Sequence, residues 1–150
     1  MIDLEAIKDF KVLFLGDRIL DVYTYVRPVG KAVKESALSC MFVKQEHFYG
    51  GVWAAKDHLL TFVDHIDYRG GKMDMENIRL VDEVYQRKLF VTHRPREATE
   101  RWDPLRDMGW FDLVIITDFG NGALTPELIA RATKEARFLA VNAQTNATNY

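Results

Sequence analysis

The sequence contains a single cysteine, Cys40, and no long apolar run. One cysteine cannot form a disulfide within the chain. No stretch approaches the roughly 18 consecutive apolar residues of a membrane-spanning helix. Because 20 Lys and Arg residues stand against 22 Asp and Glu residues, no basic excess attracts nucleic acid or anionic lipid. We therefore expect neither a membrane nor a nucleic acid as a partner.

The amino-terminal segment also lacks the order of a secretory signal. Such a signal is basic first and then continuously apolar, whereas "MIDLEAIKDF" is acidic and amphipathic. We expect a cytoplasmic protein.

The four histidines do not form a metal-binding pattern. His47, His58, His65 and His93 show neither H-x-x-x-H nor H-E-x-x-H spacing, and no cysteine pair could complete a zinc site. We expect solvated or hydrogen-bonded histidines and no bound metal. The spacing proposes no Ser-His-Asp or Cys-His catalytic pair either.

The composition is that of one globular domain. The chain has 150 residues, of which 48% are hydrophobic and 28% are charged. A domain of this size buries roughly 70% of the surface that its unfolded chain exposes. No repeat, low-complexity tract or linker marks a second domain, so we predict one domain over residues 1–150.

Apolar runs that alternate with amphipathic segments predict an α/β fold. "KVLFL" at 11–15, ending at Gly16 and Asp17, and "FDLVIITDF" at 111–119 are typical of strands buried on both faces of a parallel sheet. A threonine and a proline before "ELIARATKEA" predict a capped helix over 125–136, followed by a strand over 137–142.

The segments between these elements are rich in β-branched and aromatic residues and half polar. They predict a small, half-exposed sheet and one helix. The expected strands are 21–30, 36–49, two strands within 64–84 separated by a glycine turn, and 87–94, with the helix over 52–62 and a surface connection over 95–110.

Asp118 lies in the tripeptide D-F-G, which also holds magnesium in protein kinases. A protein kinase needs a lysine-bearing strand under a glycine-rich loop and an H-R-D segment before that aspartate, and none precedes Asp118. Two interpretations remain. An aspartate at the carboxyl end of a parallel strand lies where α/β sheets bind ligands. Alternatively, Asp118 accepts hydrogen bonds in a tight turn that Gly120 and Gly122 allow.

Three stretches taken together resemble one family. "KVLFLGDRILDVYTYV", "FYGGVWAAKDHL" and "DLVIITDFGNGALTPELI" occur in the order and approximate spacing found in the ribokinase (pfkB) carbohydrate kinases. The chain is most similar to the kinase portion of the bifunctional heptose-phosphate kinase/nucleotidylyltransferase enzymes of ADP-heptose synthesis. Their motifs are G-D-x-x-L-D, a G-G before a helix, and D-Y-x-K-G followed by L-T-P-E-L. The resemblance covers residues 11–142 and implies a ribokinase-like parallel sheet with flanking helices and a small β-lid, truncated to its amino-terminal part.

The resemblance also implies substrate-binding residues. Asp21 matches an aspartate that accepts hydrogen bonds from sugar hydroxyls, and Asp17 matches the acid before it, which could equally satisfy a turn. Gly50 and Gly51 match a pair that lets backbone amides approach the sugar, although such a pair also suits a tight turn before a helix. Asp118 belongs to the third motif.

Residues 18–48 and 77–94 match the β-lid, which covers the sugar and often pairs with another subunit. An exposed aromatic surface suggests an interface, here a homodimer, whereas packing within the lid is the alternative. The aromatic residues concerned are Tyr23, Tyr25, Phe42 and Phe48.

Two positions depart from the family pattern. An asparagine early in the helix after the glycine pair is replaced by Ala54, which leaves Asp57 as the nearest polar candidate for sugar contact. The lysine of D-Y-x-K-G is Asn121, which removes a positive charge that would face an anionic substrate.

The family's catalytic segment has no counterpart in the sequence. G-A-G-D supplies an anion hole for the phosphoryl group and the base that deprotonates the sugar hydroxyl, and no segment matches it. We therefore assign no catalytic residue. ATP and Mg²⁺ are implied only for the complete enzyme, with a sugar or sugar phosphate as substrate. Two functions remain: the sugar-binding amino-terminal part of a carbohydrate kinase, inactive alone, or a non-catalytic module for binding or subunit assembly.

Overall fold

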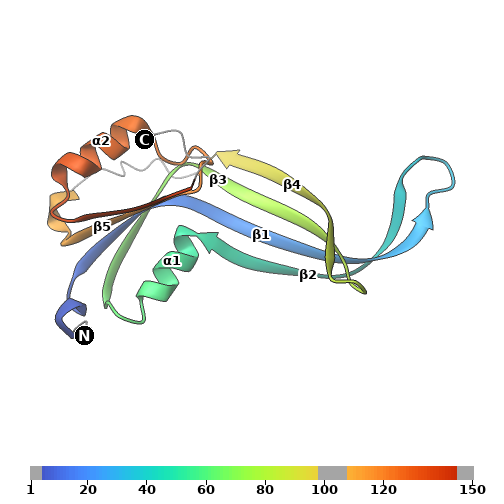
Figure 1. The fold of residues 1–150 in the computed structure, drawn as a ribbon, viewed down its shortest axis with the longest axis horizontal. Helices are drawn as coiled ribbons and strands as arrows, with labels where there is room; N and C mark the ends of the chain where they lie inside the picture. The colour runs from blue at the N-terminus through green and yellow to red at the C-terminus, as the bar shows by residue number, and fades with distance from the viewer. Residues whose placement is uncertain (1–4, 98–107, 145–150) are drawn as a thin grey trace. The chain divides into compact units, whose positions relative to one another are not determined.

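The computed structural model describes residues 5–97 and 108–144 (Figure 1). Residue contacts divide the chain into two compact units. We call the described parts of 1–19, 49–75 and 95–150 the α/β unit, and residues 20–48 and 76–94 the strand unit. The elements in chain order are η1 (Glu5–Ile7), β1 (Lys11–Lys31), β2 (Leu38–Gly51), α1 (Val52–Leu59), β3 (His65–Asp82), β4 (Arg87–Glu97), η2 (Met108–Trp110), β5 (Leu113–Asp118), α2 (Pro126–Glu135) and β6 (Leu139–Ala143).

The α/β unit is built on parallel strand pairs, as the sequence predicts. β1 pairs with β5 from Val12 opposite Leu113 to Gly16 opposite Thr117. β5 in turn pairs with β6, again in parallel. The fold class is therefore α/β with a parallel sheet, and the β1–β5 pairing ends where Gly16 lies opposite Thr117.

The two faces of this sheet carry separate apolar clusters. Leu13 and Leu15 of β1 pack with Val114 and Ile116 of β5 and with the α2 side chains Leu128 and Ala132. The alternate residues Val12 and Phe14 point to the other face, where Val52 and Leu59 of α1 join them. Figure 1 shows α1 and α2 on opposite sides of β1. Burial on both faces explains why these strands are continuously apolar.

The end of β5 leads into α2 through a capped turn. The Thr125 hydroxyl accepts a hydrogen bond from the Leu128 N–H, with 3.3 Å between the two atoms, and Pro126 occupies the first turn. Glu127 lies near the positive end of the helix and Lys134 near its negative end. The predicted helix and its cap are confirmed.

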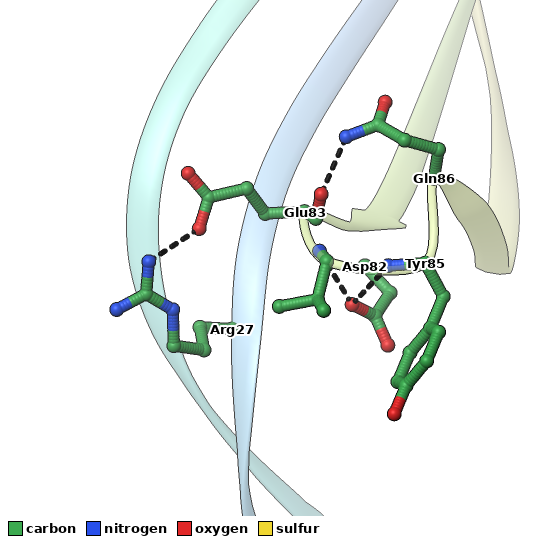
Figure 2. A network of polar contacts seen from close by, with 6 residues as sticks. Arg27, Asp82, Glu83, Tyr85 and Gln86 are labelled. Atoms are coloured by element: carbon green, nitrogen blue, oxygen red, sulfur yellow. Dashed lines mark hydrogen bonds and ion pairs between the residues drawn. The ribbon is translucent and has the colours of Figure 1, made fainter.

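In the strand unit, β2 and β3 pair with β1, and β4 pairs with β3. Figure 2 shows the turn between β3 and β4, where the buried Asp82 carboxylate accepts hydrogen bonds from the N–H groups of Val84 (2.9 Å) and Tyr85 (3.2 Å). Gln86 has a left-handed φ of 51° and donates a side-chain hydrogen bond to the Glu83 carbonyl. Arg27 of β1 forms a 2.7 Å ion pair with Glu83.

Two predicted boundaries are wrong. β1 does not end at Gly16 and Asp17 but runs unbroken to Lys31, because pairing with neighbouring strands continues across both residues. β3 likewise has no glycine turn, since Gly70 and Gly71 adopt extended backbone within one strand. Most of the predicted surface connection at 95–110 lies outside the described residues. Among the described helices, none is long and apolar enough to cross a membrane.

Candidate functional site

Asp17 lies at the carboxyl end of the parallel pairing between β1 and β5, and its side chain is fully buried. Its Oδ2 accepts a hydrogen bond from the Phe119 N–H at 2.6 Å, and its Oδ1 accepts one from the Ala123 N–H at 3.3 Å. The loop after β5 therefore wraps around this carboxylate. Asp17 performs the turn-satisfying role that the sequence left open, and its sugar-binding role stays a prediction.

Burial raises the pKa of Asp17 above its ordinary value of 3.8. The backbone N–H groups of Phe119, Ala123 and Asn121 stabilise the charged form and oppose this rise, whereas the neighbouring charge of Asp118 adds to it. Desolvation is the largest of these effects.

Asp118 is also buried and belongs to the same loop. Its Oδ1 accepts a hydrogen bond from the Gly120 N–H at 2.8 Å, which closes a short turn. Gly120 and Gly122 have φ values of 76° and 84°, a left-handed region that glycine adopts without strain. Asn121, half-buried, lies between the two glycines. These contacts stabilise the loop, and ligand-binding roles for Asp118 and Asn121 stay predictions.

The glycine pair precedes α1 and packs closely against β1. Gly51 has φ 60° and caps the helix without a side-chain hydrogen bond. A Cβ atom at this position would lie less than 3.0 Å from the Asp17 carbonyl oxygen, closer than real contacts allow. Glycine is therefore required at this position for packing within the α/β unit, whether or not a ligand binds to Gly50 and Gly51. Asp57 is exposed on α1.

Asp21 belongs to the strand unit and is part of a polar network. Its Oδ1 accepts a hydrogen bond from Asn77 Nδ2 at 3.0 Å and also forms an ion pair with Arg79. Asn77 Oδ1 lies 2.7 Å from His93 Nδ1. Both protein donors bond the same carboxylate oxygen, and Oδ2 receives no hydrogen bond from the residues that the structure describes. The Asp21 side chain is 23% exposed.

The sequence did not predict roles for Asn77 and Arg79, and it predicted a solvated or hydrogen-bonded His93 without a named partner. The three residues come from strands β3 and β4, whereas Asp21 comes from β1. Their only local signal is the spacing of two between Asn77 and Arg79, which places both on one face of β3. That signal indicates that Asn77 and Arg79 share a face of β3, but it does not indicate that both contact Asp21.

Some aromatic residues of the strand unit contact other side chains of the unit, and some are largely exposed. Tyr23 contacts Phe48 edge to face, with 5.5 Å between ring centroids, and the Lys44 ammonium lies 4.6 Å from the Tyr25 ring centroid. The two tyrosines are thus engaged within the unit. Phe42 and Phe48 nevertheless remain 65% and 51% exposed.

Two observations on the described residues bear on whether this chain could hold magnesium and ATP. Within residues 5–97 and 108–144, no group of three or more His, Cys, Asp or Glu side chains is placed to hold a metal ion. The loop after β5 is not an open phosphate cradle, because its N–H groups at Phe119, Gly120 and Ala123 donate to Asp17 and Asp118.

No protein-family model and no curated protein sequence matches the chain. Among solved structures, it is similar to the tetrameric inhibited form of phosphofructokinase-2 from Escherichia coli, with 16% identity, 92% of this chain and 56% of that chain covered, and a TM-score of 0.49. Ribokinase from Thermotoga maritima is 9% identical, with 88% of this chain and 52% of that chain covered and a TM-score of 0.48. A nucleoside kinase from Methanocaldococcus jannaschii, described as an archaeal member of the ribokinase family, is 12% identical, with 96% of this chain and 56% of that chain covered and a TM-score of 0.46. The chain thus spans about half the length of these kinases.

Proposed function

We propose that this chain is the sugar-binding amino-terminal portion of a ribokinase-type carbohydrate kinase. The complete enzyme would transfer a phosphoryl group from ATP to a hydroxyl of a sugar or sugar phosphate. A heptose phosphate is the substrate that the sequence motifs favour. We further propose a cytoplasmic location and a homodimer formed through the aromatic face of the strand unit, by which we mean the exposed side chains of Phe42 and Phe48.

The observation that carries this proposal is the state of the Asp21 carboxylate. Asn77 and Arg79 hold one of its oxygens, whereas the other accepts no hydrogen bond from the described residues and the side chain stays partly exposed. An ionised carboxylate that is fixed in this way is a strong, directional acceptor for a hydroxyl group. Asp21 also closes G-D-R-I-L-D, the motif in which the family carries its sugar-binding aspartate.

Gly50 and Gly51 would have a backbone role, because the absence of side chains allows amide groups to approach a sugar. Supporting polar contacts would come from Asp17, Asp57, Asp118 and Asn121. We propose no catalytic residue in this chain.

One observation favours the second function, a non-catalytic module for binding or assembly. N–H groups of the loop after β5 donate hydrogen bonds to the carboxylates of Asp17 and Asp118, and Asn121 occupies the position of the family lysine. Such a loop offers no positive charge to an anionic substrate, and its N–H groups at Phe119, Gly120 and Ala123 are already used within the protein. A module of this kind would keep the α/β core and the aromatic face but would have no affinity for sugars.

Calorimetry with fructose 6-phosphate, ribose and a heptose phosphate separates the two functions. We expect at least one of these sugars to bind, and Asp21→Asn to weaken that binding by about 10- to 150-fold, the equivalent of a lost hydrogen bond to a charged group. Asparagine keeps the shape and one acceptor oxygen, so Arg79 retains a partner.

Glu46→Gln is the matched control, because Glu46 is a carboxylate of the same unit that pairs with Lys44. Its sugar affinity should equal that of the wild type. Binding of none of the three sugars would leave the assembly module as the better account. A sugar that binds Asp21→Asn and the wild type equally well would instead give Asp21 a structural role outside the sugar site. ATP consumption by the 150-residue chain with any of these sugars would contradict the assignment of no catalytic residue.

A further inference from the structure

The network around Asp21 consists of side chains that three strands bring together. Asp21 lies on β1, Asn77 on β3 and His93 on β4. Asn77 is a buried residue, 9% exposed, so its amide forms its hydrogen bonds largely out of contact with water. A buried amide has to satisfy both its donor and its acceptor groups within the protein.

The chemistry of the carboxylate fixes the direction of every bond in this network. An ionised carboxylate only accepts hydrogen bonds, so the Asn77 group next to Asp21 is the Nδ2 donor. The Asn77 oxygen therefore faces His93, 2.7 Å from Nδ1. Because that oxygen can only accept, Nδ1 of His93 has to carry the proton.

Arg79 completes the arrangement from the same strand as Asn77. It forms an ion pair with Oδ1 of Asp21, and its guanidinium lies 5.1 Å from the Tyr23 ring centroid. Two donors from β3 thus converge on one oxygen, which fixes the rotation of the carboxylate and directs Oδ2 away from them.

We propose that Asn77 is a positioning residue for Asp21 and that His93 acts through Asn77. This inference rests on the proposed function, in which Asp21 accepts a hydrogen bond from a sugar hydroxyl. His93 holds the Asn77 amide in one orientation, and Asn77 with Arg79 holds the carboxylate so that Oδ2 meets the ligand. The arrangement sets the binding geometry before the sugar arrives, which lowers the entropy cost of recognition.

The first test needs no ligand, because the network fixes the tautomer of His93. In mildly alkaline buffer, ¹⁵N NMR of the full chain should show His93 with its proton on Nδ1. Asn77→Ala removes the acceptor and should abolish this preference, whereas Gln45→Ala, which removes a separate 2.9 Å hydrogen bond to Thr24 in the same unit, should leave it unchanged. A wild-type His93 that carries its proton on Nε2 would overturn the inference.

The second test is a double-mutant cycle with fructose 6-phosphate and a heptose phosphate as probes in calorimetry. Asn77→Ala alone should weaken binding by about 5- to 30-fold, as the loss of one to two kcal/mol predicts. In the Asp21→Asn background the same change should have little further effect, because the two residues act through one contact. His93→Leu should weaken binding, and His93→Gln should restore it, since its amide can again donate to Asn77.

The outcomes distinguish this inference from the function beneath it. If Asp21→Asn weakens sugar binding but Asn77→Ala does not, Asn77 does not position Asp21. The same conclusion follows if Asn77→Ala weakens binding equally in the wild-type and the Asp21→Asn backgrounds. If Asp21→Asn leaves binding unchanged while the His93 tautomer is as stated, the network exists but serves no sugar site, and both proposals fail. Urea denaturation of each variant shows whether a binding loss reflects unfolding.

Discussion

The Asp17 carboxylate accepts a hydrogen bond from the backbone N–H of Phe119, with 2.6 Å between Oδ2 and the nitrogen. The two residues are 102 positions apart in the sequence. This bond ties the carboxyl end of the β1–β5 pairing to the loop that leads into α2. The Ala123 N–H donates a hydrogen bond to the other oxygen, so that both carboxylate oxygens of Asp17 hold the loop.

Replacing Asp17 with Asn should destabilise the α/β unit. The amide oxygen can replace one acceptor, but its NH₂ group would face an N–H donor from the loop. We expect the free energy of unfolding to fall by about 1–3 kcal/mol, the cost of leaving a buried polar group unsatisfied. Urea denaturation followed by circular dichroism measures the change. Asp9→Asn, an exposed aspartate outside this network, should leave the midpoint where it is.

The raised pKa of Asp17 predicts a pH dependence of stability. A group that binds its proton more tightly in the folded state stabilises that state while it is protonated. This contribution is complete below 3.8, the ordinary pKa, and disappears as the pH rises through the raised value. The difference in free energy of unfolding between the wild type and Asp17→Asn should therefore decrease with rising pH in that window. A difference that increases would show that the loop N–H groups outweigh burial and lower the pKa.

Gly51→Ala should be more destabilising than Gly122→Ala. Both glycines have positive φ values, 60° and 84°, so both variants carry backbone strain. Only at position 51 would the new Cβ collide with the Asp17 backbone oxygen, because Gly122 has no atom within 4 Å of its Cβ position. The extra loss should be about 1–3 kcal/mol, as for overpacking, in thermal or urea denaturation. Equal losses of unfolding free energy in the two variants would mean that the backbone of β1 and the start of α1 can move apart to accommodate the new Cβ atom at little cost.

Local signals account for the parts of the fold that the sequence predicted well. β5 follows from an uninterrupted apolar run, and α2 follows from Thr125 and Pro126, each within a few residues of the structure it specifies. Gly16 and Asp17 are locally typical of a turn, yet β1 continues through them. A Cβ on Gly16 would meet the backbone oxygen of Thr117 at less than 3.0 Å, so this glycine serves a close strand contact that only tertiary structure reveals.

The candidate site could be predicted only where a motif carried it. Asp21 was predicted as a site residue because it closes a six-residue motif. Asn77 is 56 positions from Asp21, and His93 is 16 positions from Asn77, so strand pairing alone brings the three together. No spacing rule links side chains across three strands, which is why a positioning network of this kind was not predictable from the sequence.

The cap of α2 can be tested by Thr125→Ala. Thr125 accepts a hydrogen bond from the Leu128 N–H, and an alanine leaves that donor without its side-chain partner. The free energy of unfolding should fall by about 1 kcal/mol. Thr133→Ala on the same helix is the control, because Thr133 is exposed, its hydroxyl donates to the Ile129 carbonyl within the helix, and alanine favours the helix. A larger loss for Thr133→Ala would contradict the capping role.

The proposed homodimer predicts that Phe42→Ser weakens self-association. Phe42 and Phe48 are six positions apart on β2, which places both on one face, and they are 65% and 51% exposed. If this face pairs two chains, each subunit loses about 1.5–3 kcal/mol of burial, and the dissociation constant in sedimentation equilibrium should rise at least about tenfold. Val33→Ser, at a fully exposed position between β1 and β2, should leave it unchanged. A wild-type chain that sediments as a monomer at high concentration would rule out the dimer. The aromatic face would then be a surface for some other partner.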